Sequence, residues 1–144
     1  MNITVRRAGA SDYSAIFDLT RNELGYQDLD KTKFLHRMEQ MADNSDYAAI
    51  VAENNNTVVG FLGLRRGIAY NFDGEYIQII ALAVSERMQG QGIGSHLLTW
   101  AEAYGRENGV VKFTLNSNMH RTDAHQFYER NGYQKSSFAF YKNS

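Results

Sequence analysis

Three glycines stand at alternate positions, Gly90, Gly92 and Gly94, where an apolar segment passes into an amphipathic one. Because glycine has no Cβ, a backbone rich in it can turn sharply and expose consecutive N–H groups. Those groups, together with the positive end of a following helix, form a concave site for an anion. A pyrophosphate is the natural occupant, although the same glycines also suit a tight strand-to-helix connection without a ligand.

Two familiar phosphate-binding motifs do not describe this turn. A P-loop requires Gly-Lys-Ser or Gly-Lys-Thr, and the segment from Val84 to Ser95 contains no lysine. A dinucleotide-binding turn has the spacing G-x-G-x-x-G in the first βαβ unit, whereas these glycines run 90, 92, 94 and come late in the chain. The spacing therefore points to a different motif.

The segment Gln89-Gly90-Gln91-Gly92-Ile93-Gly94 matches the Gln/Arg-x-x-Gly-x-Gly/Ala signature of the GNAT N-acetyltransferase superfamily. The apolar run before it, Ala81 to Val84, resembles the strand that leads into the signature in that family. Downstream, the segment from Ala124 to Tyr133 is similar to the family's A-x-x-FYE-x-x-GF/Y pattern. The resemblance covers roughly Tyr76 to Tyr133, and the predicted order of elements matches along the whole chain.

The resemblance implies that the protein binds acetyl-CoA as a cosubstrate. In the family, the amides of the signature hold the pyrophosphate, and the backbone of the preceding strand holds the pantetheine. That strand and the next, here Val111 to Asn116, splay apart to leave a slot for the cofactor. The residues that would bind the cofactor in these ways are Leu82, Ala83, Val84, Gln89, Gly90, Gln91, Gly92, Ile93, Gly94 and Ser95.

Further cofactor contacts are expected after the second wall of the slot. Arg121 falls where many members carry an Asn that contacts pantetheine. Asn116 and Asn118 are therefore candidates for a similar hydrogen bond, with a plain loop role as the alternative. His125, three residues before Tyr128, is expected near the cofactor edge, or else is a partly exposed helix histidine.

The reaction that the resemblance implies is transfer of an acetyl group from a thioester to a primary amine of a small molecule or peptide. A lysine-type amine has a pKa of ~10.4, so only about one in a thousand is neutral at pH 7 and some help with deprotonation is needed. Tyr128 occupies the position that often serves as general acid toward the CoA thiolate, with packing beside Phe127 as the alternative. The chain has no cysteine, which excludes an acetyl-cysteine intermediate and favours direct transfer in a ternary complex.

The general base is where the chain departs from the family. Many members carry a Glu in the strand before the signature, and the matching residue here is Gln78. A carboxamide can orient a water or the acceptor but cannot accept the proton. Glu75, three residues earlier, lies on the opposite face of a regular strand. It could serve as base only if a bulge places its side chain on the same face as Gln78, and otherwise it is a solvated charge at the end of the strand. This departure motivates an alternative function, a non-catalytic acyl-CoA-binding sensor or degenerate relative.

Acceptor recognition is expected from the loop between the first two helices, which covers the acceptor in the family. Here that loop offers Glu23, Tyr26 and Asp28, whose polar and acidic groups suit a cationic amine or simply face solvent. The chain has no H-x-x-x-H or E-x-x-H pair, so no metal site is predicted.

The hydrophobic pattern predicts the elements that position these residues. The expected fold is α/β (α+β): one GNAT-like domain over residues 1–144, with a mixed, mostly antiparallel sheet of six to seven strands, splayed central strands and about four helices. Ser11 is expected to cap the first helix. Strands are expected at 3–5, 47–52, 57–64, 76–84, 110–115 and 138–141, and further helices at 31–41, 93–106 and 122–130.

Composition limits the partners. The chain has 144 residues, a net charge of −1 and no excess of basic residues, which argues against a nucleic-acid or anionic-membrane partner. The N-terminus has no apolar h-region, and the apolar run from Ile79 to Val84 is too short to span a bilayer. We expect a cytoplasmic protein, monomeric or homodimeric.

Overall fold

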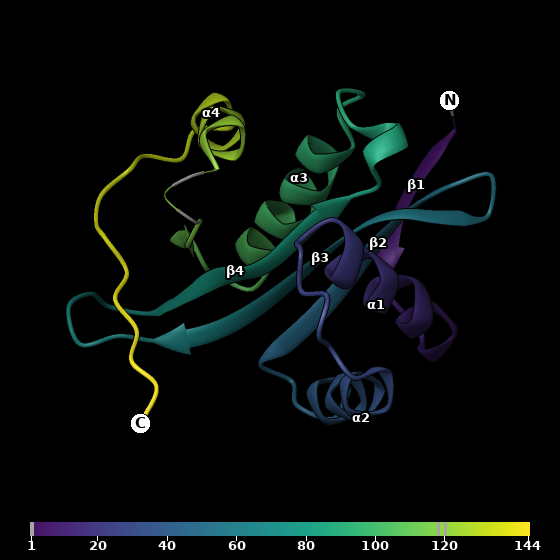
Figure 1. Cartoon of the computed structure of the whole chain (residues 1–144). Helices are drawn as coiled ribbons and strands as arrows, with labels where there is room; N and C mark the ends of the chain where they lie inside the picture. The colour runs from purple at the N-terminus through teal and green to yellow at the C-terminus, as the bar shows by residue number, and fades with distance from the viewer. Residues whose placement is uncertain (1, 118, 120) are drawn as a thin grey trace. The chain divides into compact units, whose positions relative to one another are not determined.

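The computed structural model describes residues 2–117, 119 and 121–144. The chain divides into two compact units, Met1–Thr114 and Leu115–Ser144 (Figure 1). The first unit contains, in chain order, β1 (Ile3–Arg7), the 3-10 helix η1 (Ala10–Asp12), α1 (Tyr13–Asn22), α2 (Lys31–Ala42), β2 (Tyr47–Asn54), β3 (Thr57–Ile68), β4 (Glu75–Val84), the 3-10 helix η2 (Glu86–Met88), α3 (Ile93–Glu107) and the start of β5 (Phe113–Leu115). The second unit contains the end of β5 and α4 (Thr122–Arg130).

The described strands form one sheet in the order β1-β2-β3-β4-β5. The pairs from β1 to β4 are antiparallel, and short connections join β2 to β3 and β3 to β4. The β2–β3 hairpin turns at Asn55 and Asn56, whose φ values of 51° and 67° lie in the left-handed region that asparagine tolerates.

The prediction of six to seven strands is wrong, because the described residues contribute five. The segment 138–141 carries no regular structure, and Phe140 is 92% exposed. Aromatic residues favour a strand only where a neighbouring strand pairs with them and covers one face, so a short aromatic run is a weak signal by itself.

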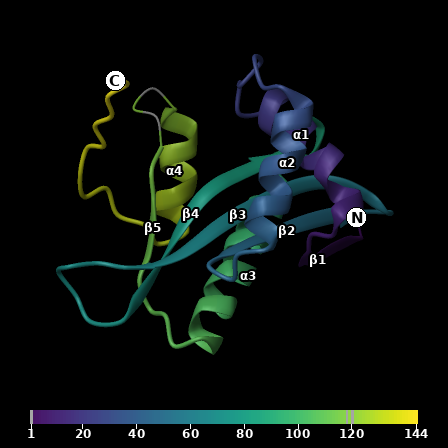
Figure 2. The same ribbon diagram turned by 90° about the horizontal axis from the view of Figure 1, so that it is seen from below.

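The two faces of the sheet are covered by different helices (Figure 2). On one face α1 and α2 pack together through Phe17 and Phe34, whose rings meet edge to face at 5.3 Å. On the other face lies α3, whose Leu97, Leu98 and Ala101 are buried, as the helical spacing predicts. A Cβ added at Gly105 of α3 would come within 2.6 Å of the Phe113 ring, so this glycine lets the helix approach β5 closely.

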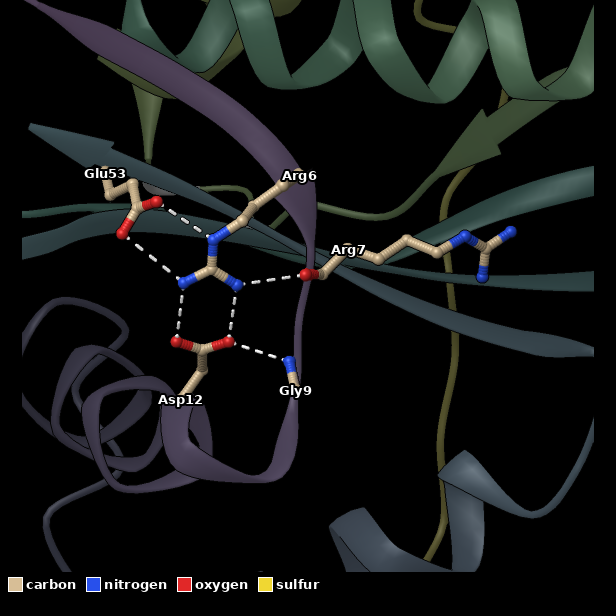
Figure 3. A network of polar contacts seen from close by, with 5 residues as sticks. All are labelled: Arg6, Arg7, Gly9, Asp12 and Glu53. Atoms are coloured by element: carbon tan, nitrogen blue, oxygen red, sulfur yellow. Dashed lines mark hydrogen bonds and ion pairs between the residues drawn. The ribbon is translucent and has the colours of Figure 1, made fainter. Parts of the chain in front are cut away.

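An arginine-centred network ties β1, β2 and the start of α1 together (Figure 3). Arg6 donates to both carboxylate oxygens of Asp12, at 2.8 and 3.0 Å, and to Glu53 at 3.0 Å. Asp12 also accepts from the N–H of Gly9 at 2.7 Å, and its side chain is only 7% exposed. Asp12 occupies the N-cap position of α1 without a side-chain cap hydrogen bond to the helix, and the expectation that Ser11 caps the helix is wrong.

A side-chain cap begins α2, and a backbone cap ends α4. Asp30 accepts from the N–H of Lys33 at 2.9 Å and begins α2 where the sequence predicts it. In the second unit, Gly132 ends α4 with a φ of 91°, and the N–H of Tyr133 donates to the carbonyl of Tyr128 at 3.0 Å. Within the described ranges, no helix has the length and apolar composition that a membrane span requires.

Candidate active site

The strand before the signature, β4, contains a bulge. Its register against β3 pairs Ile79 with Leu64 and Ala81 with Gly63, so Ile80 is an extra residue in β4. An extra residue breaks the strict alternation of a strand, and side chains on the two sides of it change faces.

Contacts on both sides of the bulge show this change. Ile77 faces α3, because its Cδ1 lies 3.1 Å from where a Cβ at Gly105 would stand. Ala83, also odd-numbered, belongs instead to the hydrophobic core beneath α1 and α2. Consequently Gln78, before the bulge, shares a face with Ala81, after the bulge, and this is the face of α1 and α2.

The C-terminal half of β4 directs backbone groups away from its partner β3. Ser85 donates its N–H to the carbonyl of Val59 in β3 at 2.7 Å. Since alternate residues of an antiparallel strand point to opposite sides, the N–H and C=O groups of Leu82 and Val84 point away from β3. These are the residues predicted to pair with pantetheine. Ala83 is 4% exposed and packs in the core.

The signature turn has the backbone conformation that the glycines predict. Gly90 and Gly92 have φ values of 79° and 83°, and a Cβ at either would meet no heavy atom of the protein within 4 Å. Gly92 is the N-cap of α3 and supplies no side-chain cap. The N–H groups of Ile93, Gly94 and Ser95 therefore begin the helix with an open left-handed turn before them, where an anion has both space and donors.

Two side chains brace this turn. Gln89 donates from Nε2 to the carbonyl of Val84 at 3.1 Å, which ties the turn to the end of β4. Glu23, predicted to bind the acceptor, accepts from the N–H of Glu86 at 3.1 Å and thus holds the start of η2. Neither contact is visible in the sequence, because each joins residues that only the fold brings together. Gln91 is exposed.

A pocket of about 310 Å³ opens on the face of α1 and α2. Its floor is a row of small residues, because Ala49 of β2, Gly63 of β3 and Ala81 of β4 are in register. Ile80, the bulge residue, also lines it. The walls come from the two helices and the start of β2, through Tyr13, Ile16, Thr20, Phe34, Arg37, Met38, Met41 and Tyr47.

The other two predicted acceptor residues do not line this pocket. Tyr26 is 60% exposed and Asp28 is exposed, both in the loop after α1. The pocket residues escaped sequence reasoning because scattered Ala and Gly residues carry no motif. Only the register of three strands places Ala49, Gly63 and Ala81 side by side.

The two candidates for the base lie on opposite faces of β4. Gln78 accepts from Nη2 of Arg65 at 3.0 Å, and the same Nη2 donates to the hydroxyl of Tyr76 at 3.2 Å. Glu75 pairs with Arg66 at 2.6 Å on the other face. The bulge lies after both residues and so cannot bring Glu75 round to the pocket. This placement does not favour Glu75 as the base.

Tyr128 belongs to the second unit. Its ring packs edge to face against Phe127 at 5.3 Å and Tyr133 at 6.2 Å. Burial raises the pKa of the Tyr128 phenol, and the nearby charge of Arg121 opposes this in part. A phenol with a raised pKa stays protonated at neutral pH, as a proton donor must.

The remaining predicted cofactor contacts also belong to the second unit. Asn116 is exposed and His125, on α4, is half-buried. Asn118 lies outside the described residues. In the part of the chain that the structure describes, no group of three or more acidic, His or Cys residues could hold a metal ion.

Comparisons with known proteins place the chain in a family. The model of the acetyltransferase (GNAT) family matches residues 13–133. An aminoalkylphosphonate N-acetyltransferase from Salmonella typhimurium is 37% identical over 132 residues, which span 92% of this chain and 82% of that protein.

Solved structures share the fold at lower sequence identity. A structure described as a transcriptional regulator from Bacillus halodurans C-125 superposes with a TM-score of 0.92 at 23% identity, over 99% of this chain and 100% of that one. An aminoglycoside N-acetyltransferase in complex with CoA gives a TM-score of 0.88 at 11% identity, over 99% and 95% of the two chains. With the open signature turn and the bulged strand, these matches show that the chain belongs to the GNAT family and is an acetyl-CoA-dependent acetyltransferase.

Proposed function

We propose that the protein transfers the acetyl group of acetyl-CoA to a primary amine of a small molecule. The observation that carries this proposal is the arrangement around the bulge in β4. Ile80 and Ala81 line the pocket, and the next residue, Leu82, directs its backbone groups away from β3. An acceptor in the pocket and a pantetheine chain along that edge would therefore meet at one strand.

Acetyl-CoA would supply the acetyl group as an activated thioester. Gly90 and Gly92 leave space at the start of α3, and the first N–H groups of the helix would donate to the pyrophosphate. The backbone groups of Leu82 and Val84 would hydrogen-bond to the pantetheine amides. An N–H on this edge would also stabilise negative charge that develops on the acetyl oxygen.

Two proton transfers would accompany the reaction, one from the acceptor amine and one to the CoA thiolate. The acceptor nitrogen forms a bond to the acetyl carbon as the carbon–sulfur bond breaks. Because Gln78 cannot accept the proton of the amine, that proton would leave through water. The thiolate would take a proton from the phenol of Tyr128, whose raised pKa keeps it protonated until then.

Two observations favour a small acceptor over a peptide. The pocket, at about 310 Å³, is at the low end of the range for small-molecule sites. The Salmonella relative is named for aminoalkylphosphonates, which are small amines. We therefore place small aminoalkyl compounds first among the candidate acceptors.

Steady-state kinetics test this proposal. Release of free CoA thiol is measured while acetyl-CoA and an amine are varied together, across amino acids, aminoalkylphosphonates, polyamines, aminoglycosides and peptides. Direct transfer predicts intersecting double-reciprocal lines and an N-acetylated product by mass spectrometry. Tight acetyl-CoA binding without acetylation of any amine would instead make the protein a CoA-binding protein without turnover.

A further inference from the structure

Neighbouring arginines on β3 have different electrostatic surroundings. Arg66 faces α3 and pairs with the carboxylate of Glu75 at 2.6 Å. Arg65 faces α1 and α2, and both of its side-chain hydrogen bonds go to neutral oxygens, the carboxamide of Gln78 and the hydroxyl of Tyr76. Among the described residues, no carboxylate pairs with Arg65. Its positive charge is therefore held in place without being neutralised.

Arg65 does not itself line the pocket, but the strand register places it next to the pocket floor. It lies two residues beyond Gly63 on the same strand face, and its register partner on β2 is Tyr47, which lines the pocket. Two residues along a strand span about 7 Å, so the guanidinium is within reach of a small molecule that rests on the floor.

The charged residues that line the pocket are Arg7 and Arg37, and both are basic. Arg37 of α2 lines it, and its guanidinium lies 5.4 Å from the ring centre of Phe34, another wall residue. Arg37 also has no carboxylate partner in the described part of the chain. Arg7 contributes to the lining as well, but its guanidinium stacks on Tyr104 of α3, at 5.2 Å from the ring centre.

We propose that Arg65 and Arg37 bind an anionic group at the far end of the acceptor, so that its amine lies at the bulge of β4. The acceptor is then a short aminoalkyl compound with a phosphonate, phosphate or carboxylate terminus. This inference rests on the proposed acetyl transfer and adds the residues that select the acceptor. The proposed acceptor thus carries an anionic group, whereas the acidic residues of the 23–30 loop suggested a purely cationic acceptor.

Gln78 acquires a role under this proposal. A Glu at this position would lie against Arg65 and neutralise it, because the carboxamide oxygen already stands 3.0 Å from Nη2. A carboxamide accepts the same hydrogen bond and leaves the guanidinium charge available to a ligand. Gln78 is thus a positioning residue for Arg65.

A series of acceptors of equal chain length gives the first test. Acetylation of an aminoalkylphosphonate and an aminoalkyl carboxylate is compared with that of a neutral amino alcohol and a diamine. We expect kcat/KM to be about 10- to 100-fold higher for the anionic acceptors, as charge-assisted hydrogen bonds predict. Equal values across the series would overturn the proposal, whereas a lack of acetylation of any amine would overturn the proposed function instead.

Substitution of Arg65 gives the second test. Arg65→Gln should lower kcat/KM for the anionic acceptors by about 10-fold or more through KM, and leave the neutral acceptor and the KM for acetyl-CoA little changed. Arg65→Lys, which keeps the charge, should restore part of the loss. Arg66→Gln is the matched control, since it removes the same charge from the adjacent residue on the opposite face. An equal loss for anionic and neutral acceptors in Arg65→Gln would refute the assignment.

Gln78→Glu separates the electrostatic role from a catalytic one. If Gln78 preserves the charge of Arg65, the variant should lose the preference for anionic acceptors, as Arg65→Gln does. A rise in kcat for every acceptor would show instead that a carboxylate here serves as a base. An alkylphosphonate without an amine should inhibit competitively against the acceptor, and competition against acetyl-CoA alone would contradict the assigned site.

Discussion

A valine at Gly92 would test the phosphate turn with an internal control. Gly92 has a φ of 83°, a conformation that costs an L-residue about 1–2 kcal/mol. Gly74, in the β3–β4 connection, also has a φ of 83°, and a Cβ at either glycine would meet no heavy atom within 4 Å. Gly92→Val and Gly74→Val should therefore lose similar stability, about 3–7 °C in Tm for a chain of this size.

Only the variant at Gly92 should lose affinity for acetyl-CoA. The new side chain would enter the space before α3 where the pyrophosphate is expected, and each amide–phosphate hydrogen bond lost costs about 1.5–3 kcal/mol. Isothermal titration calorimetry should then show a Kd raised by about 10- to 100-fold in Gly92→Val. A wild-type Kd in that variant, or an equal loss in Gly74→Val, would refute the phosphate assignment.

Three further predictions concern other parts of the chain. Tyr128→Phe should lower kcat and leave the Kd of acetyl-CoA unchanged. An unchanged kcat, measured by release of free thiol, would show that the Tyr128 ring serves only in packing. Arg6 lowers the pKa of Asp12, so this contribution to stability is present above the usual carboxyl pKa and is lost as pH falls through the lowered value. Denaturant titrations at a series of pH values should show that the free energy of unfolding falls with pH in the wild type and falls less in Asp12→Asn. At pH 7, Asp12→Asn should be about 1–3 kcal/mol less stable than the wild type. Gly105→Ala should cost about 1–3 kcal/mol by calorimetry, because its Cβ would overlap the Phe113 ring.

Features set by local chemistry were predictable from the sequence. The Asn55–Asn56 turn, the glycines of the signature and the end of α4 at Gly132 all depend on residues that tolerate a positive φ. The hydrophobic spacing of the helices gave their bounds to within one residue in α2 and α3, since an amphipathic face repeats over several turns. Recognition of the family depended on these same local segments.

Features that arise from pairing between distant segments were not predictable. The run Ile79-Ile80-Ala81 is apolar throughout, so its pattern shows no break in alternation where the bulge falls. Without the bulge, Gln78 and Ala81 would be assigned to opposite faces of β4. The pocket floor and the bond between Arg65 and Gln78 depend on the same register, and no single segment contains a signal for either.

The bulge also bears on how the acceptor amine loses its proton. The pocket face of β4 carries Gln78 and Ala81 but no acidic residue, and Glu75 is paired on the other side. The floor of the pocket is apolar, and a buried ammonium group without a carboxylate partner has a lowered pKa. With the proposed placement of the acceptor, the apolar floor of the pocket would therefore favour the neutral form of its amine, and the reaction would depend less on a carboxylate base.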